Sequence, residues 1–181
     1  DAFKDCSNLK TINLPEGLEY IGTRAFQNSG LTGTLEIPSS VTTIENMAFS
    51  GCNNITYVTI NEGLSELKSS SFGNMKNLKI VSIPASITKM TYPFGSTENL
   101  STVYYGGTLE DWLNIEIVSG GPLYYAKYLF YADNAGTITY NEKNYSLLTD
   151  LVVPSSVTAI GAYQFNGYKS LNTVVLHEGV T

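Results

Sequence analysis

The stretch that decides the fold is Ala2–Gly22, with the sequence A-F-K-D-C-S-N-L-K-T-I-N-L-P-E-G-L-E-Y-I-G. Its apolar positions return along the chain at intervals of 23 residues, and a period of this length indicates a repeat architecture. Five columns of apolar residues share the spacing. They are Phe3, Phe26, Phe49 and Phe72; Ile12, Leu35, Val58 and Val81; Leu14, Ile37, Ile60 and Ile83; Leu18, Val41, Leu64 and Ile87; and Ile21, Ile44, Leu67 and Met90.

The middle of the unit predicts a short strand with one buried face. Ile12 and Leu14 alternate with the polar residues Thr11 and Asn13, which is the period of two that a half-buried strand requires. Pro15 ends the strand, because proline has no N–H group to donate to a ladder.

The rest of the unit predicts the return of the coil. Leu18 and Ile21 indicate a second, looser strand, and residues 23–28 a single helical turn that points Phe26 inward. One unit cannot close a core alone, whereas stacked units bury a continuous interior. We therefore expect a mostly β, right-handed solenoid with a parallel β-sheet on one side and short strands and single helical turns on the others.

The repeats divide the chain into three parts of one solenoid domain. Residues 1–112 hold five regular coils, residues 113–147 leave the pattern, and residues 148–181 resume it. The chain begins and ends inside a repeat, so we expect it to be a fragment of a longer protein.

The irregular part carries signals of its own. Tyr128–Tyr131 is a candidate strand of the sheet, Asp133–Gly136 a turn, and Thr137–Tyr140 a return strand, which together predict a protruding hairpin. Leu109–Ile115 has acidic residues in its first turn and predicts a short helix. We expect this helix to place Trp112 in the core position that Ile21 fills in the first coil.

The unit resembles the BspA-type leucine-rich repeat, an atypical class with A-F-x-x-C-x-x-L and I-P-x-x-V-x-x-I-G signatures. The matching stretches are Ala2–Leu9, Ala48–Cys52 and Val153–Gly161. The resemblance implies the solenoid fold and a place among long surface proteins of host-associated bacteria and some parasitic protists. It also implies a role in adhesion to host matrix or to other cells, and an extracellular or cell-surface location.

Composition excludes several kinds of partner. The 181 residues are 43% apolar, so a core can form, and the net charge is −6, with 10 Lys and Arg against 16 Asp and Glu. Such a chain lacks the basic field that nucleic acid requires, and an anionic membrane surface would repel it. No run of 18 apolar residues is present, so no membrane insertion of this segment is expected.

The residues that support catalysis or metal binding are few. Cys6 and Cys52 share one repeat position two coils apart, about 9–10 Å, which is too far for a disulfide. We expect both to be free and buried. His177 is the only histidine and is expected at the surface. We therefore expect no catalytic residue, no metal site and no cofactor.

A group of acids leaves one enzymatic alternative open. Glu110, Asp111 and Glu116 form the densest acidic group, and paired carboxylates are what a glycosidase uses. A solvated helix face is the ordinary explanation, so a glycan-acting enzyme is the remote alternative.

The outward positions of the sheet are the candidate binding surface, because repeat scaffolds bind partners along such faces. Tyr57 and Tyr104 would be its anchors, since tyrosine combines large rigid area with a hydroxyl. The competing explanation is that Thr and Tyr simply favour strands. The candidate binding residues are Thr11, Asn13, Thr34, Glu36, Tyr57, Thr59, Ser82, Thr102 and Tyr104.

Two functions follow from these observations. The first is a non-catalytic, adhesin-like segment that binds a host matrix protein, another cell-surface protein or a glycan. The alternative is an inert spacer that holds another domain away from the cell surface. The tyrosine-rich stretch Tyr124–Tyr131 and the hairpin form a second candidate surface.

Overall fold

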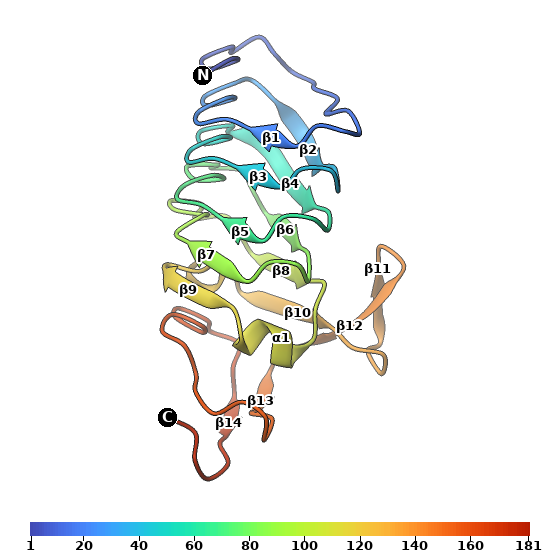
Figure 1. Cartoon of the computed structure of the whole chain (residues 1–181), viewed down its shortest axis with the longest axis vertical. Coiled ribbons are helices and arrows are strands. Elements are labelled where there is room, and N and C mark those ends of the chain that lie inside the picture. The colour runs from blue at the N-terminus through green and yellow to red at the C-terminus, as the bar shows by residue number, and fades with distance from the viewer.

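The computed structural model describes all residues from 1 to 181 as a stack of coils with two columns of strands (Figure 1). This confirms the predicted mostly β solenoid with a parallel sheet along one side. The long strands of that sheet are β2 (Thr32–Ile37), β4 (Asn54–Ile60), β6 (Ile80–Ile83), β8 (Thr102–Tyr105) and β10 (Tyr128–Ala132). The short strands are β1 (Tyr20–Ile21), β3 (Thr43–Ile44), β5 (Glu66–Leu67), β7 (Lys89–Thr91) and β9 (Glu116–Ser119).

Strand β4 shows why the long strands form. Val58 and Ile60 are buried, and Tyr57 and Thr59, which alternate with them along the strand, point to the outer face. Neighbouring strands pair in parallel with equivalent residues opposite each other, so the alternation repeats in every coil. The inner column runs through five strands as Leu35, Val58, Val81, Val103 and Leu129.

The phenylalanine column confirms that the 23-residue period is a spatial stack. The rings of Phe3, Phe26, Phe49 and Phe72 follow one another at centroid distances of 5.1, 5.1 and 5.6 Å, and Phe94 continues the column at 5.8 Å. Phe49 is fully buried, whereas Phe3, in the first coil, is 44% exposed. The column is therefore the centre of one continuous core.

The return segments are successive turns rather than the predicted single helical turns. In residues 23–28, the Ala25 N–H donates to Gly22 within the coil, whereas the Phe26 N–H donates to Ala48 of the next coil at 2.8 Å. Arg24 and Asn28 hold positive φ angles of 54° and 57°, which end any helical progression. Alternate N–H groups thus bond between coils instead of forming a helix.

Helix α1 (Leu109–Leu113) begins where the sequence places it. The Thr108 hydroxyl accepts from the Asp111 N–H, and the Asp111 carboxylate accepts from the Thr108 N–H at 2.8 Å. This capping box satisfies two N–H groups that a helix start otherwise leaves free. Trp112 is fully buried, with its ring edge against Tyr105 at 5.3 Å.

The predicted core position of Trp112 is wrong. The column that begins with Ile21 continues from Met90 to Ile117, because β7 pairs with β9 in that register. Helix α1 lengthens the coil, so Ile117 arrives four residues later than the 23-residue period would place it. The 3-10 helix η1 (Pro122–Tyr124) follows β9. None of the helices is long and apolar enough to cross a membrane.

The hairpin exists, but its return strand differs from the prediction. Asp133–Gly136 is a turn, as expected, yet the antiparallel partner of β10 is β12 (Lys143–Leu147). Strand β11 (Ile138–Tyr140) pairs with the far side of β12, and so forms the outer strand of the projection beside β10 in Figure 1. The hairpin turn is Asn141–Glu142, where both residues have positive φ.

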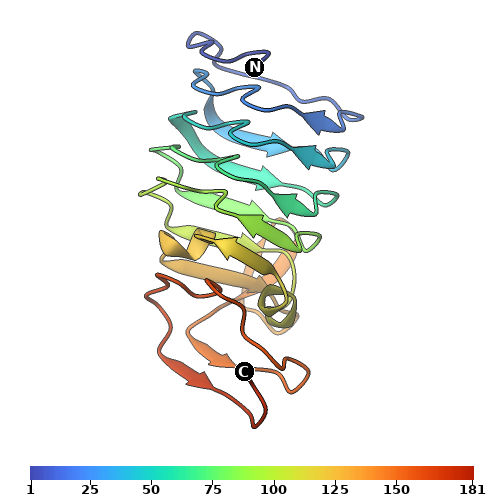
Figure 2. The same ribbon diagram turned by 60° about the vertical axis from the view of Figure 1, so that its left-hand side comes forward.

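The last coils form a separate sheet of β13 (Asp150–Val152) and β14 (Thr173–Val175), seen at the C-terminal end in Figure 2. Strand β12 occupies part of the free edge of β10, and the Tyr168 hydroxyl occupies another part. This hydroxyl accepts a hydrogen bond from the Leu129 N–H at 3.2 Å and donates one to the Leu148 carbonyl at 2.6 Å. The long sheet therefore ends at the hairpin.

Candidate functional site

The nine candidate binding residues lie on the outer face of the sheet side of the solenoid, here called the outer sheet face. Their exposure falls toward the hairpin. Thr11, Asn13, Thr34 and Glu36 are exposed, whereas Tyr57, Thr59, Ser82, Thr102 and Tyr104 are half-buried. The strand register arranges the later ones in two rows, namely Thr34, Tyr57, Ile80, Thr102 and Tyr128, and Glu36, Thr59, Ser82, Tyr104 and Phe130.

The hairpin covers the middle of this face with one tyrosine. The Tyr140 ring stacks on Tyr104 at 4.3 Å and lies 6.1 Å from Tyr57. Tyr57 and Tyr104 belong to coils two apart, and the coil between them presents Ile80 and Ser82, neither of which is aromatic. Tyr140 thus supplies a ring where the intervening coil has none.

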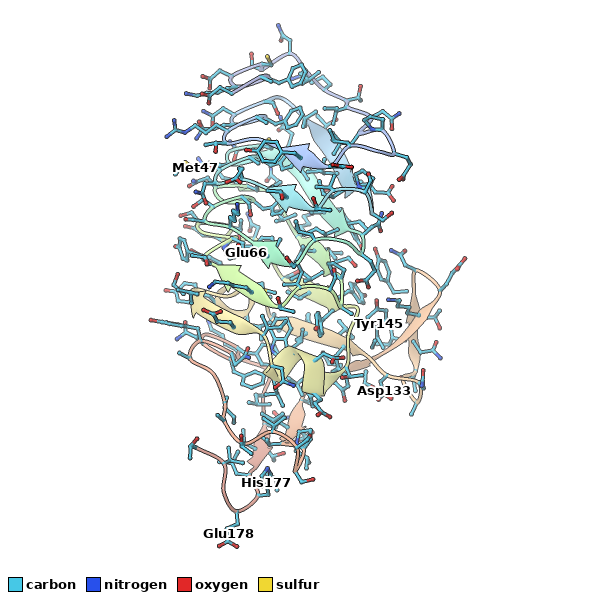
Figure 3. The ribbon with its side chains drawn as sticks, in the orientation of Figure 1. Met47, Glu66, Asp133, Tyr145, His177 and Glu178 are labelled. Atoms are coloured by element: carbon cyan, nitrogen blue, oxygen red, sulfur yellow. The ribbon has the colours of Figure 1, made fainter.

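Two further rings complete this group, and we call Tyr57, Tyr104, Phe130, Tyr140 and Tyr145 the aromatic cluster. Phe130 stacks on Tyr104 at 5.0 Å, and Tyr145 meets Tyr104 edge-on at 5.4 Å. Figure 3 shows Tyr145 between the hairpin and the coils. Burial raises the pKa of the Tyr140 and Tyr145 hydroxyls above the ordinary value, so both stay neutral.

The two predicted anchor tyrosines already have aromatic partners within the chain. Tyr57 and Tyr104 already contact the hairpin, and the Tyr57 hydroxyl is buried without a hydrogen-bond partner. Their role in binding stays a prediction. Tyr140 was included in the predicted hairpin surface without being named as a contact of Tyr104, and Tyr145 was not part of that prediction; both lie outside the repeat. Their one signal is the turn Asn141–Glu142 between two polar and aromatic segments.

Three hollows adjoin the hairpin. The first, of about 350 Å³, lies between the hairpin tip and the early coils and is lined by Thr34, Glu36, Tyr57, Thr59, Asn61, Tyr140 and Asn141. The second, of about 320 Å³, is lined chiefly by Thr59, Asn61, Glu62, Ser82, Asn141, Lys143 and Tyr145. The third, of about 770 Å³, lies between the hairpin and α1 and includes Glu110, Asp133, Glu142 and Lys143.

Polar contacts fix the hairpin and the groups around it. Lys143 Nζ lies 3.8 Å from Glu62 Oε1, and Asn61 donates to Glu36 at 3.3 Å. Asp133, labelled at the base of the hairpin in Figure 3, accepts from the Ala135 N–H and the Ser146 hydroxyl. These bonds lower the pKa of the Asp133 carboxyl, so it is ionised at neutral pH.

The acidic group has structural partners. Glu110 accepts from the Ser156 hydroxyl at 2.7 Å, Asp111 completes the capping box, and Glu116 pairs with Lys89 at 3.0 Å. No group of three or more His, Cys, Asp or Glu side chains is arranged to hold a metal ion. Each of these acids therefore makes a structural contact near the end of a helix or a strand.

The cysteines are free, as predicted, but only one is buried. Cys52 Sγ donates to the Phe26 carbonyl at 3.1 Å and lies 3.3 Å from the Ser29 hydroxyl. Burial raises the pKa of the Cys52 thiol, which keeps it protonated and unreactive. Cys6 is exposed, contrary to the prediction, because no coil covers that side of the first coil.

His177 bonds between turns rather than standing free at the surface. Its Nε2 lies 3.1 Å from the Pro154 carbonyl and 3.0 Å from that of Val157, and its Nδ1 lies 2.9 Å from the Glu178 carbonyl. Carbonyls facing both ring nitrogens favour the protonated ring and raise the pKa of His177. The side chain ties the last coil to the one before it.

The tyrosine-rich stretch does not form one surface. Tyr124 is exposed, while the Tyr125 hydroxyl accepts from the Ser96 N–H at 3.1 Å on the turn side of the solenoid. Tyr128 and Phe130 lie on the outer sheet face. Only the end of the stretch therefore adjoins the aromatic cluster.

The fold and its repeats define a class of protein. The chain is a stack of coils that share columns of apolar residues and parallel strands, and proline follows the strand in several coils. This arrangement is that of a leucine-rich repeat solenoid. The profile of the BspA type leucine rich repeat region matches residues 1–112 and 126–181 with six copies. The chain belongs to this family, and the predicted resemblance is confirmed. Leucine-rich repeat proteins are generally non-enzymatic scaffolds.

Solved leucine-rich repeat structures match the chain at low sequence identity. A leucine-rich repeat protein from Bacteroides ovatus is 19% identical, with a TM-score of 0.45 over 99% of this chain and 46% of its own. A leucine rich cell surface protein from Faecalibacterium prausnitzii is 18% identical, with a TM-score of 0.35 over 96% of this chain and 61% of its own. The chain thus spans about half of these proteins. No curated protein matches it significantly.

Proposed function

We propose that this chain is a non-catalytic binding segment of a cell-surface or secreted, adhesin-like leucine-rich repeat protein. It takes a protein or a glycan on the outer sheet face, beside the hairpin. The observation that supports this most directly is the hairpin itself. An irregular segment leaves the solenoid, places Tyr140 on Tyr104 and creates hollows on both sides of its tip.

The chemistry of the face supports binding rather than catalysis. Tyrosine, threonine and asparagine side chains on a rigid sheet give contact area and hydrogen bonds at low entropic cost. The acids that a glycosidase would need are engaged, since Glu110 bonds Ser156 and Asp111 caps α1. An ionised Asp133 supplies no general acid.

A binding screen tests this function. The chain is presented to immobilised matrix proteins, cell-surface proteins and glycans, and Glu36→Lys is compared with Glu19→Lys. Both glutamates are exposed, but only Glu36 lines a hollow on the outer sheet face. We expect Glu36→Lys to weaken binding about tenfold and Glu19→Lys to leave it within twofold. No binding at all, or equal loss in both variants, would instead support an inert spacer.

A further inference from the structure

Two of the hollows adjoin each other at the hairpin tip. The hollows of about 350 and 320 Å³ share Thr59, Asn61 and Asn141 as lining residues. Thr59 lies near the end of β4, Asn61 directly follows that strand, and Asn141 comes from the hairpin turn. We call the two adjoining hollows together the hairpin-tip groove. Each half has the volume of a small-ligand site.

The groove is lined by groups that bond to hydroxyls. Its hydroxyl, amide, carboxylate and ammonium side chains are Thr34, Glu36, Thr59, Asn61, Glu62, Ser82, Asn141 and Lys143. The rings of Tyr57, Tyr140 and Tyr145 supply apolar wall, and Ile60, Ile83 and Pro84 add to it in the second hollow. Most small-molecule pockets have only a few polar groups. A lining that sets many hydrogen-bonding side chains beside aromatic rings suits a ligand that is itself polyhydroxylated.

Charge excludes an anionic ligand. Glu36 and Glu62 line the two halves, and Lys143, the one cation in the lining, already lies 3.8 Å from Glu62. A sulfate, phosphate or uronic acid would meet more negative than positive charge here, in a chain whose net charge is −6.

The backbone around the second hollow does not suit a peptide strand. Strand β4 pairs with β2 on one side and β6 on the other, and β12 lies between β10 and β11. An extended peptide gains affinity by adding to a free strand edge, and the edge strands β2 and β11 line only the first hollow.

From these contacts we infer that the hairpin-tip groove binds a neutral saccharide chain, with Asn61 and Asn141 bonding its hydroxyls. The inference rests on the proposed function and gives it a ligand class. The walls are held in place before binding, because β4 is paired on both sides, with β2 and β6, and Tyr140 fixes the hairpin on Tyr104. A preformed groove avoids the cost of ordering loops on binding.

A glycan panel followed by titration tests the inference. The full chain is applied to neutral, sialylated and sulfated oligosaccharides, and the tightest neutral one is titrated by calorimetry. We expect neutral members alone to bind. Asn61→Ala and Asn141→Gly should each weaken binding about tenfold, the effect of one lost hydrogen bond. Glycine suits the positive φ of residue 141, so the turn is kept.

The matched control is Glu142→Gly. Residue 142 is the other half of the same turn, also has positive φ, and lines only the hollow beside α1. We expect its affinity to stay within twofold, with unchanged thermal unfolding in all three variants. Binding of only sialylated or sulfated glycans, or equal loss in the control, overturns the inference. A protein ligand on the outer sheet face overturns it while sustaining the proposed function, and no ligand of any kind overturns both.

Discussion

The regular coils and the irregular segment 109–147 are held together in different ways. In the regular coils each residue packs on its own equivalent in the next coil, as Phe26 does on Phe49 at 5.1 Å. In the irregular segment the contacts join unlike residues, such as Tyr140 with Tyr104 and Gln164 with the end of α1. Repetition therefore builds the scaffold, and single unrepeated contacts build the site.

The largest expected effect tests the repeated core. Phe49→Ala removes a fully buried ring from the middle of the phenylalanine column and should cost about 3–5 kcal/mol of unfolding free energy. Phe3→Ala is the matched control, because its ring is 44% exposed and stacked on one side only. Urea denaturation measures both. Equal losses would mean that the column does not act as one core.

The next effect tests a single unrepeated contact. Gln164 is buried, and its Nε2 faces the carbonyls of Trp112, Leu113 and Ile115 at 3.1, 2.9 and 2.8 Å. Gln164→Ala removes the side-chain donor to the Leu113 and Ile115 carbonyls, whereas the Trp112 carbonyl keeps the Ile115 N–H. We expect the substitution to lower the free energy of unfolding by about 2 kcal/mol. Gln27 lies at a half-buried turn position of a regular coil. We expect Gln27→Ala to change the free energy of unfolding by no more than about 0.5 kcal/mol. If denaturant unfolding gave the same free energy for Gln164→Ala as for the unsubstituted chain, α1 would not depend on the hydrogen bonds of Gln164.

A smaller and local effect tests the hairpin. Tyr140→Ala removes the ring that stacks on Tyr104. We expect it to lower the stability of the hairpin against local opening by about 1 kcal/mol. Amides of residues 138–147 should then exchange hydrogen about fivefold faster, while those of β4 and β6 stay protected. Thr139→Ala, which loses only an exposed bond to Asn144, is the control. Faster exchange throughout the solenoid would contradict the separation between scaffold and hairpin.

The smallest effect concerns an unsatisfied hydroxyl. The Tyr57 hydroxyl is buried without a partner, so Tyr57→Phe removes a buried polar group and breaks no hydrogen bond. We expect the melting temperature to stay the same or rise slightly. Tyr104→Phe, whose hydroxyl has no such burial, is the comparison. A clear loss of stability in Tyr57→Phe would show that the hydroxyl has a partner after all.

Much of the scaffold followed from the sequence, because a stack of equal coils turns a period in the chain into a column in space. The stacked phenylalanines, the alternation of buried and outward residues and the start of α1 at Leu109 were all predicted from local pattern. The turns were not, since Arg24 and Asn28 hold left-handed backbone without being glycine. Bonds between coils, rather than the residues themselves, impose that geometry.

The candidate site was only partly predicted. The rows through Tyr57 and Tyr104 lie on the outer sheet face as expected, but what covers them came from outside the repeat. Tyr140 reaches them because β12, not the preceding segment, pairs with β10. Strand order in an unrepeated segment depends on which edge is free, and no period in the sequence records that.

The sequence by itself determined the solenoid, its sheet and its core, because each coil needs only its neighbour, and the neighbour has the same pattern. Only the tertiary structure decided where the hairpin lies, that Ile117 and not Trp112 continues the Ile21 column, and that Asn61 and Asn141 share one groove. These outcomes depend on contacts between segments that differ in sequence. Which segments meet is decided after the coils have stacked, by the shapes of the surfaces, the free strand edges and the hydrogen-bonding groups that remain.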